Sequence, residues 1–143
     1  FGWAKPVPIN PNRMRNPRTG VIWTSLAGPA SNLLIAFVMM IPFRILESIP
    51  ISSEAMYNTL SIIYSILYFF ILVNIGLAVF NLIPIPPLDG FGVITQIFRL
   101  DRYEWWYTVY HYGYYILLIA IILDIPTLFI SPGVNFFLNL LLG

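Results

Sequence analysis

Long uncharged stretches dominate the chain, and they predict helices that cross a membrane. Residues 21–43 contain no charged side chain, and 55–88 form a second, longer run without charge. A helix needs roughly 20 apolar residues to span a bilayer core, at about 1.5 Å of rise per residue. We therefore predict transmembrane helices over 25–46 and 56–80, with a short turn between them.

Three further segments complete the predicted architecture. Residues 105–123 form a third uncharged run, and tryptophans and tyrosines gather at its start, as is typical of the membrane–water interface. We predict a third transmembrane helix there. The stretch 134–142 follows a Ser-Pro-Gly turn and is too short to span alone, so it predicts a partial or re-entrant helix. Prolines and basic residues over 1–24 favour a membrane-associated loop.

Composition agrees with this pattern. Hydrophobic residues make up 59% of the chain and charged residues only 9%, whereas soluble domains carry roughly 25% charged residues. The fold class predicted is therefore an all-α, polytopic helical membrane protein, with residues 1–143 in one transmembrane domain. The chain has no cysteine, which excludes disulfides and thiolate metal sites. No basic cluster is dense enough to indicate a nucleic-acid partner.

A proline-broken segment over 82–90 ends the second uncharged run. Its prolines interrupt the helix, and Asp89 follows the last of them after one residue. Irregular backbone at membrane depth is tolerated where it is buried in protein or lines a wet cavity, and an ionisable residue there is a candidate functional group. A carboxylate can bind zinc. The alternative is an ordinary interfacial turn in which Asp89 caps the next helix.

Two other polar residues are candidates for a functional role. His111 is the only histidine, so no His-Glu-x-x-His motif exists, and its aromatic neighbours favour an interfacial role over a metal ligand. Asn32 follows a cluster of small residues, Ala-Gly-Pro-Ala-Ser over 27–31, that would let another helix approach closely. Its amide would need a polar partner if buried.

The distribution of lysine and arginine predicts the orientation in the membrane. Two crossings separate the loop at 1–24 from the loop at 82–104, so both loops lie on one side. That side carries Lys5, Arg13, Arg15, Arg18, Arg99 and Arg102. The opposite side carries only Arg44. Positive charge marks the cytoplasmic face, so we predict that both loops are cytoplasmic.

Three segments together resemble one family. They are Phe-Gly-Trp-Ala-Lys-Pro-Val-Pro-Ile-Asn at 1–10, Leu-Ala-Gly-Pro-Ala-Ser-Asn at 26–32 and Phe-Asn-Leu-Ile-Pro-Ile-Pro-Pro-Leu-Asp-Gly at 80–90. In this order and spacing they resemble the site-2 protease family of intramembrane zinc metalloproteases. The last segment is the most specific, and the resemblance extends to about residue 120.

The resemblance implies an active site with zinc as its cofactor. In that family an upstream helix carries His-Glu-x-x-His, whose histidines bind zinc and whose glutamate is the general base. The aspartate of the Leu-Asp-Gly motif is the third protein ligand, which implies that Asp89 binds the metal. Asn81 matches an asparagine that helps to hold the substrate. Residues implied to surround the active site are Asn32, Pro84, Pro86 and Gly90.

The His-Glu-x-x-His motif itself is absent from these 143 residues. We therefore expect this chain to be the C-terminal portion of a metalloprotease core, inactive alone, with its N-terminal part missing. A naturally shortened, inactive relative is the alternative. The expected partners are the lipid bilayer and a membrane-anchored protein substrate, cleaved in regulated intramembrane proteolysis. A membrane transporter or a non-catalytic scaffold remains a competing function, since transporters also contain broken helices with an acidic residue.

Overall fold

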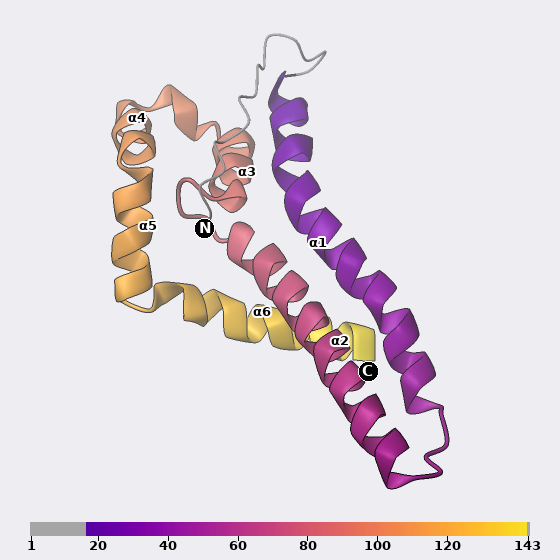
Figure 1. Cartoon of the computed structure of the whole chain (residues 1–143). Helices are drawn as coiled ribbons and strands as arrows, with labels where there is room; N and C mark the ends of the chain where they lie inside the picture. The colour runs from indigo at the N-terminus through magenta and orange to yellow at the C-terminus, as the bar shows by residue number, and fades with distance from the viewer. Residues whose placement is uncertain (1–16, 143) are drawn as a thin grey trace.

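A computed structural model describes residues 17–142, and they form helices joined by short connections (Figure 1). In chain order the elements are α1 (Pro17–Glu47), α2 (Glu54–Asn81), α3 (Asp89–Phe98), the 3₁₀ turn η2 (Leu100–Arg102), α4 (Glu104–His111), α5 (Gly113–Ile122) and α6 (Ile125–Leu142). No strand occurs in this part of the chain. The predicted all-α fold is confirmed, and three of its helices are long and apolar enough to cross a membrane.

Helices α1 and α2 pack against each other in antiparallel directions (Figure 1). On α1 the buried positions are three, four or seven residues apart, which places them on one face. Those positions include Ala36, Met40 and Phe43, and they meet a matching face of α2 that contains Ile71 and Ile75. The outward faces of both helices carry large apolar side chains, as expected for surfaces in contact with lipid.

Helix α1 begins earlier than predicted. The expected loop over 1–24 is already helical from Pro17 onward, while residues 1–16 lie outside the described part of the chain. Proline is well accommodated in the first turn of a helix, where its missing N–H would have no partner anyway. Arg18 in that turn also reaches α3 and donates to backbone carbonyls there.

The third predicted crossing is instead two helices. Over 105–123 the chain forms α4 and α5, which are separated at Tyr112. Gly113 begins α5 and packs so closely on the proline-rich segment that a Cβ atom there would lie 3.0 Å from Pro86 Cβ. Glycine is also a poor helix former. The break between α4 and α5 therefore lies where Gly113 packs on the proline-rich segment. The uninterrupted run of apolar residues gave no sign of this break.

The third candidate span is α6, where only a partial helix over 134–142 was predicted. The helix is continuous from Ile125 to Leu142 and includes Pro132, so the predicted turn at 131–133 is absent. Gly133, next to Pro132, has no side chain and so lets α6 approach Val79 of α2. A Cβ atom on Gly133 would lie only 2.6 Å from Val79 Cγ1. Small residues commonly permit such close helix contacts.

The proline-broken segment is confirmed between α2 and α3. Its irregular backbone covers 82–88, and Asp89 and Gly90 already belong to the first turn of α3. The peptide bond between Pro86 and Pro87 is cis. The segment lies against α5 through Gly113 and leads into α3, which packs on the N-terminal part of α1. This arrangement sets the position of Asp89.

Candidate functional site

Asp89 is the first residue of α3 and faces the neighbouring helix α1. Its carboxylate is partly buried, and its Oδ2 atom would lie 3.4 Å from a Cβ atom placed on Gly28 of α1. Burial raises the pKa of the Asp89 carboxyl above its ordinary value. A negative charge at a helix N-terminus is favoured by the helix dipole, and a bound cation would favour it further. Asp89 is therefore a partly buried carboxylate that lies close to a second helix.

Two glycines let α3 approach its neighbours closely. A Cβ atom on Gly90 would lie 2.1 Å from the carbonyl oxygen of Leu82, so no side chain fits there without moving backbone. A Cβ atom on Gly92 would lie 2.9 Å from Oγ of Ser25, a buried residue of α1. Through these contacts the first turns of α3 are held against both the end of α2 and the face of α1.

Helix α4 supports the same region from the other side. The indole Nε1–H of Trp106 donates a hydrogen bond of 2.9 Å to Oγ1 of Thr95, which is almost fully buried. The ring of Trp106 also stacks on Phe91 at a centroid distance of 6.2 Å. Both partners are residues of α3. The helix that carries Asp89 is thus fixed by α1, by α4 and by the end of α2.

The other predicted site residues lie around this carboxylate in differing environments. Asn32 is partly buried on α1, about one turn after Gly28 and on the same side of the helix. The amide of Asn81, at the end of α2, donates to the carbonyl oxygen of Leu77 in its own helix at 2.9 Å. In the proline-rich segment Pro86 is buried and Pro84 is exposed. Their proposed roles remain predictions.

Several residues that shape the site were not identified from the sequence as site residues. They are Ser25, Gly92 and Gly113, which contribute close packing rather than chemistry, and Gly28, which was interpreted only as a small residue for helix contact. Gly92 carried a usable signal, since it follows Gly90 by two positions inside a ten-residue helix. A glycine in a short helix often marks a close backbone approach.

The described residues supply only part of the ligands that a zinc site needs. The Asp89 carboxylate is a suitable donor. Among residues 17–142, however, no group of three or more His, Asp, Glu or Cys side chains could hold a metal ion. His111 is exposed on α4 and makes an edge contact with the ring of Tyr112. The described chain can therefore contribute one zinc ligand, and the remaining ligands would have to come from elsewhere.

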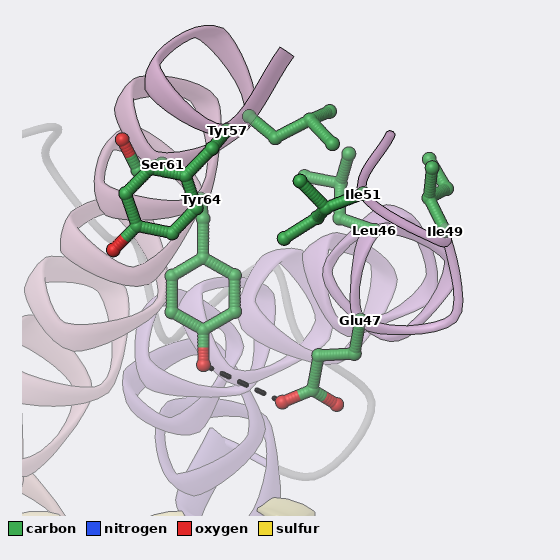
Figure 2. A pocket seen from close by; sticks show the side chains of 8 residues that line it. Leu46, Glu47, Ile49, Ile51, Tyr57, Ser61 and Tyr64 are labelled. Atoms are coloured by element: carbon green, nitrogen blue, oxygen red, sulfur yellow. Dashed lines mark hydrogen bonds between the residues drawn. The ribbon is translucent and has the colours of Figure 1, made fainter. Parts of the chain in front are cut away.

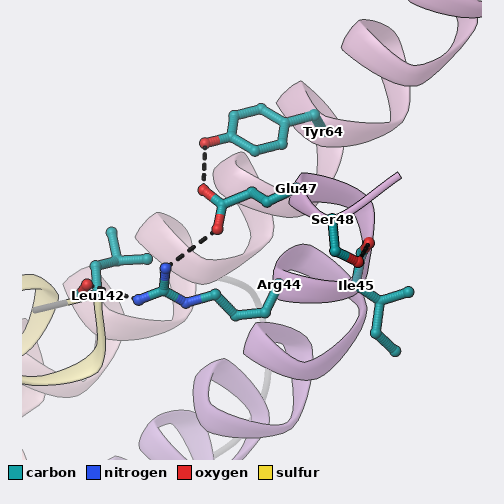
Figure 3. A network of polar contacts seen from close by, with 6 residues as sticks. All are labelled: Arg44, Ile45, Glu47, Ser48, Tyr64 and Leu142. Carbon is teal, nitrogen blue, oxygen red and sulfur yellow. Dashed lines mark hydrogen bonds and ion pairs between the residues drawn. The ribbon is translucent and has the colours of Figure 1, made fainter. Parts of the chain in front are cut away.

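A separate cavity lies at the other end of the α1–α2 pair. It has a volume of about 290 Å³ and is lined mainly by apolar residues of both helices and their connection, together with Glu47 and Tyr64 (Figure 2). Figure 3 shows a polar network beside it, in which Arg44 pairs with Glu47 at 3.1 Å and donates to the carbonyl oxygen of Leu142 at 2.6 Å. Gly28 and Glu47 are nineteen positions apart along α1, or about 28 Å, so this cavity is distinct from the Asp89 region.

Comparison with known proteins identifies the family. Residues 48–123 match the sequence model of peptidase family M50, and this range contains both Asn81 and Asp89. The chain is 30% identical over 136 residues to a protein of Bacillus subtilis (strain 168) named "Putative zinc metalloprotease YwhC". That alignment covers 94% of this chain and 61% of the relative. No solved structure matches the chain.

The match covers more than half of the chain, and it includes the proline-rich segment on which the sequence resemblance mainly rested. Three of the described helices are also long and apolar enough to cross a membrane. The chain therefore belongs to peptidase family M50, the site-2 protease family of zinc metalloproteases.

Proposed function

We propose that this chain forms part of an intramembrane zinc metalloendopeptidase that hydrolyses peptide bonds of membrane-embedded substrates. The observation that carries the proposal is the position of Asp89. A carboxylate follows a proline-broken segment in an M50 sequence, and it lies partly buried in the first turn of α3, close to Gly28 of α1. Because the chain belongs to a peptidase family, peptide hydrolysis is favoured over transport as the function of the proline-broken segment. Regulated cleavage of a membrane-anchored precursor is the proposed biological setting.

Asp89 is proposed to supply one protein ligand to zinc. The two histidine ligands and the glutamate base would come from a His-Glu-x-x-His helix outside these 143 residues, in the remaining part of the same protein. When bound, zinc polarises the scissile carbonyl and lowers the pKa of its water ligand to about 7. The role of this chain is to hold the carboxylate in place, which the close contacts at Gly90 and Gly92 support.

The proline-rich segment is proposed to hold the substrate in an extended form. Prolines 84, 86 and 87 have no N–H, so the carbonyl groups around them are not all paired within a helix. Extended peptides bind well to such unpaired backbone groups. Asn81, which stands at the end of α2 beside this segment, is proposed to contact the substrate strand. A transmembrane helix must unwind locally before its peptide bond can be cleaved, and such contacts would stabilise the unwound form.

The proposed orientation places the Asp89 end of the molecule toward the cytoplasm. Arg18 at the start of α1 donates to the carbonyl oxygens of Gln96 and Ile97, so these cationic segments lie together. Arg44 lies at the opposite end of α1. At the first end stand Arg18, Arg99 and Arg102, against Arg44 alone among described arginines at the other, and this excess supports a cytoplasmic location for the segments 1–24 and 82–104.

Removal of zinc tests the proposed function. Treatment of the intact protein with a chelator should abolish cleavage of a reconstituted transmembrane substrate, and stoichiometric zinc should restore it, because the nucleophilic water depends on the metal. Cleavage can be followed by gel electrophoresis of a labelled substrate. Full activity in a protein shown to be free of metal would contradict the proposal. Absence of cleavage by the zinc-loaded protein would favour a non-catalytic relative.

The contribution of Asn81 can be separated from its effect on the helix. We expect Asn81→Ala in the intact enzyme to lower kcat/KM for a transmembrane substrate by about tenfold, the effect of losing one hydrogen bond of ~1.4 kcal/mol. Asn74→Ala is a matched control, because both amides donate at 2.9 Å to a carbonyl four residues earlier. Equal rates for the two variants would remove the substrate-binding role of Asn81.

A further inference from the structure

A pocket of about 460 Å³ lies where the start of α1 meets the end of α3. Three arginines from three different elements surround it: Arg18 from α1, Arg99 from the end of α3, and Arg102 from η2. The rest of its lining consists of Pro17, Val21, Gln96 and Asp101. One carboxylate thus stands among three guanidinium groups, and the pocket has a net positive charge.

The arginines of this pocket are not neutralised by ion pairs within the described chain. Between residues 17 and 142 the only ion pair joins Arg44 to Glu47, at the other end of α1. Arg18 donates to two backbone carbonyls, and these bonds use only part of its five N–H donors. Arg102 lies over the ring of Tyr103, with 5.3 Å between its Cζ atom and the ring centroid. Donor capacity for an anion therefore remains.

Arg99 occupies a backbone conformation that disfavours it. With a φ of 52° it ends α3 in the left-handed region, where glycine is the usual residue. A side chain at such a position is strained, and strain of this kind is concentrated at functional sites. The side chain at this position is a cation exposed at the pocket.

The position of the pocket indicates which anion it would bind. It lies at the beginning of α1, one of the three candidate membrane spans. Exposed aromatic residues flank this end of the molecule, namely Trp23 on α1 and the stacked pair Tyr103 and Trp105. Tryptophan and tyrosine are enriched at the level of lipid headgroups. Pro17 and Val21 give the pocket an apolar wall beside its arginines.

We propose that this pocket binds the phosphate of an anionic phospholipid headgroup. Guanidinium groups bind phosphate oxygens through paired hydrogen bonds, and each basic residue near a membrane surface strengthens attraction to anionic lipid. The proposal goes beyond the proteolytic function and does not depend on it. It places a lipid at one end of α3, while Asp89 lies at the other end, about 15 Å along the helix axis.

Binding of a short-chain anionic lipid tests the site. Full-length protein in detergent is titrated with dioctanoyl phosphatidylglycerol, and the dissociation constant is measured. We expect Arg99→Gln and Arg102→Gln each to raise that constant about fivefold, and Asp101→Asn to lower it. Arg44→Gln and Glu54→Gln are the controls, since they make the same charge changes at the far end of α1 and α2. Equal effects from the control variants would show a general charge effect and overturn the site.

A further variant separates binding from folding. Arg99→Gly removes the cation but suits the left-handed backbone, so it should weaken lipid binding about fivefold without lowering the melting temperature. Normal lipid binding by this variant would overturn the proposal.

Two other probes distinguish the source of the phosphate. Dioctanoyl phosphatidylcholine, whose headgroup is neutral overall, should bind several-fold more weakly than phosphatidylglycerol. Inorganic phosphate should compete only at much higher concentration than the lipid. Equal affinity for the two lipids, or for free phosphate and phosphatidylglycerol, would contradict an anionic-lipid site.

Discussion

Replacement of Asp89 by alanine in the intact enzyme is expected to lower kcat/KM for a transmembrane substrate by more than about 100-fold. Loss of a residue that only supports a metal ligand typically costs 10- to 100-fold in affinity or activity, so loss of a ligand itself should cost more. Asp89 is an acidic residue that lies partly buried in the first turn of α3, close to Gly28 of α1. Cleavage of a labelled substrate in proteoliposomes gives the measurement.

Glu54→Ala is the control for this variant. Glu54 is an exposed acidic residue at the start of α2, in the first turn of that helix and away from α3. We expect the control to cleave substrate at the rate of the unmodified protein. A loss of less than tenfold in Asp89→Ala, with the control unaffected, would show that this carboxylate does not belong to the catalytic centre.

Gly90→Ala should have the second largest effect, although it adds only one methyl group. That carbon would lie 2.1 Å from the carbonyl oxygen of Leu82 and 2.7 Å from that of Ile83, and both are backbone atoms. We expect destabilisation of about 2–3 kcal/mol, the upper part of the range for overpacking, because backbone atoms must move. Displacement of the neighbouring Asp89 should also remove most of the activity. Thermal unfolding in detergent and the cleavage assay measure the two effects.

Gly76→Ala is a matched control in α2. A Cβ atom on Gly76 would meet nothing within 4 Å, and the residue lies in the interior of the helix. Alanine there should stabilise the protein by about 0.5–1 kcal/mol, because glycine loses more backbone entropy on folding. If both variants changed stability by the same amount, the close contact at Gly90 would not be what holds the first turn of α3 in place.

The sequence predicts the fold well where long uncharged runs coincide with helices. The run over 55–88 indicated both α2 and the irregular segment that follows it, because proline lacks the N–H that a helix requires. The same reasoning failed over 105–123, where apolar residues continue across the break at Tyr112. It failed again in α6, since Pro132 is accommodated within the helix. In both places a glycine contact with another segment was not visible in the local pattern.

The sequence indicated which residue could carry the chemistry of the candidate site. It did not indicate which other residues would lie around it. Asp89 stood out because a carboxylate follows three prolines after a long uncharged run. Its contact with Gly28 links two helices far apart in the sequence, and no periodicity in either segment indicates it. The hydrogen bond from Trp106 to Thr95 is similar, since the sequence suggested only an interfacial aromatic residue. Such pairings depend on how the helices pack, which one sequence does not determine by itself.

The central claim is that Asp89 supplies a ligand to a catalytic zinc ion, and the zinc content of the intact protein tests it most directly. We predict about one zinc ion per molecule in the unmodified protein and a clear loss of zinc from Asp89→Ala after dialysis, with the helical content unchanged by circular dichroism. Full retention of zinc by a folded Asp89→Ala protein would contradict the account.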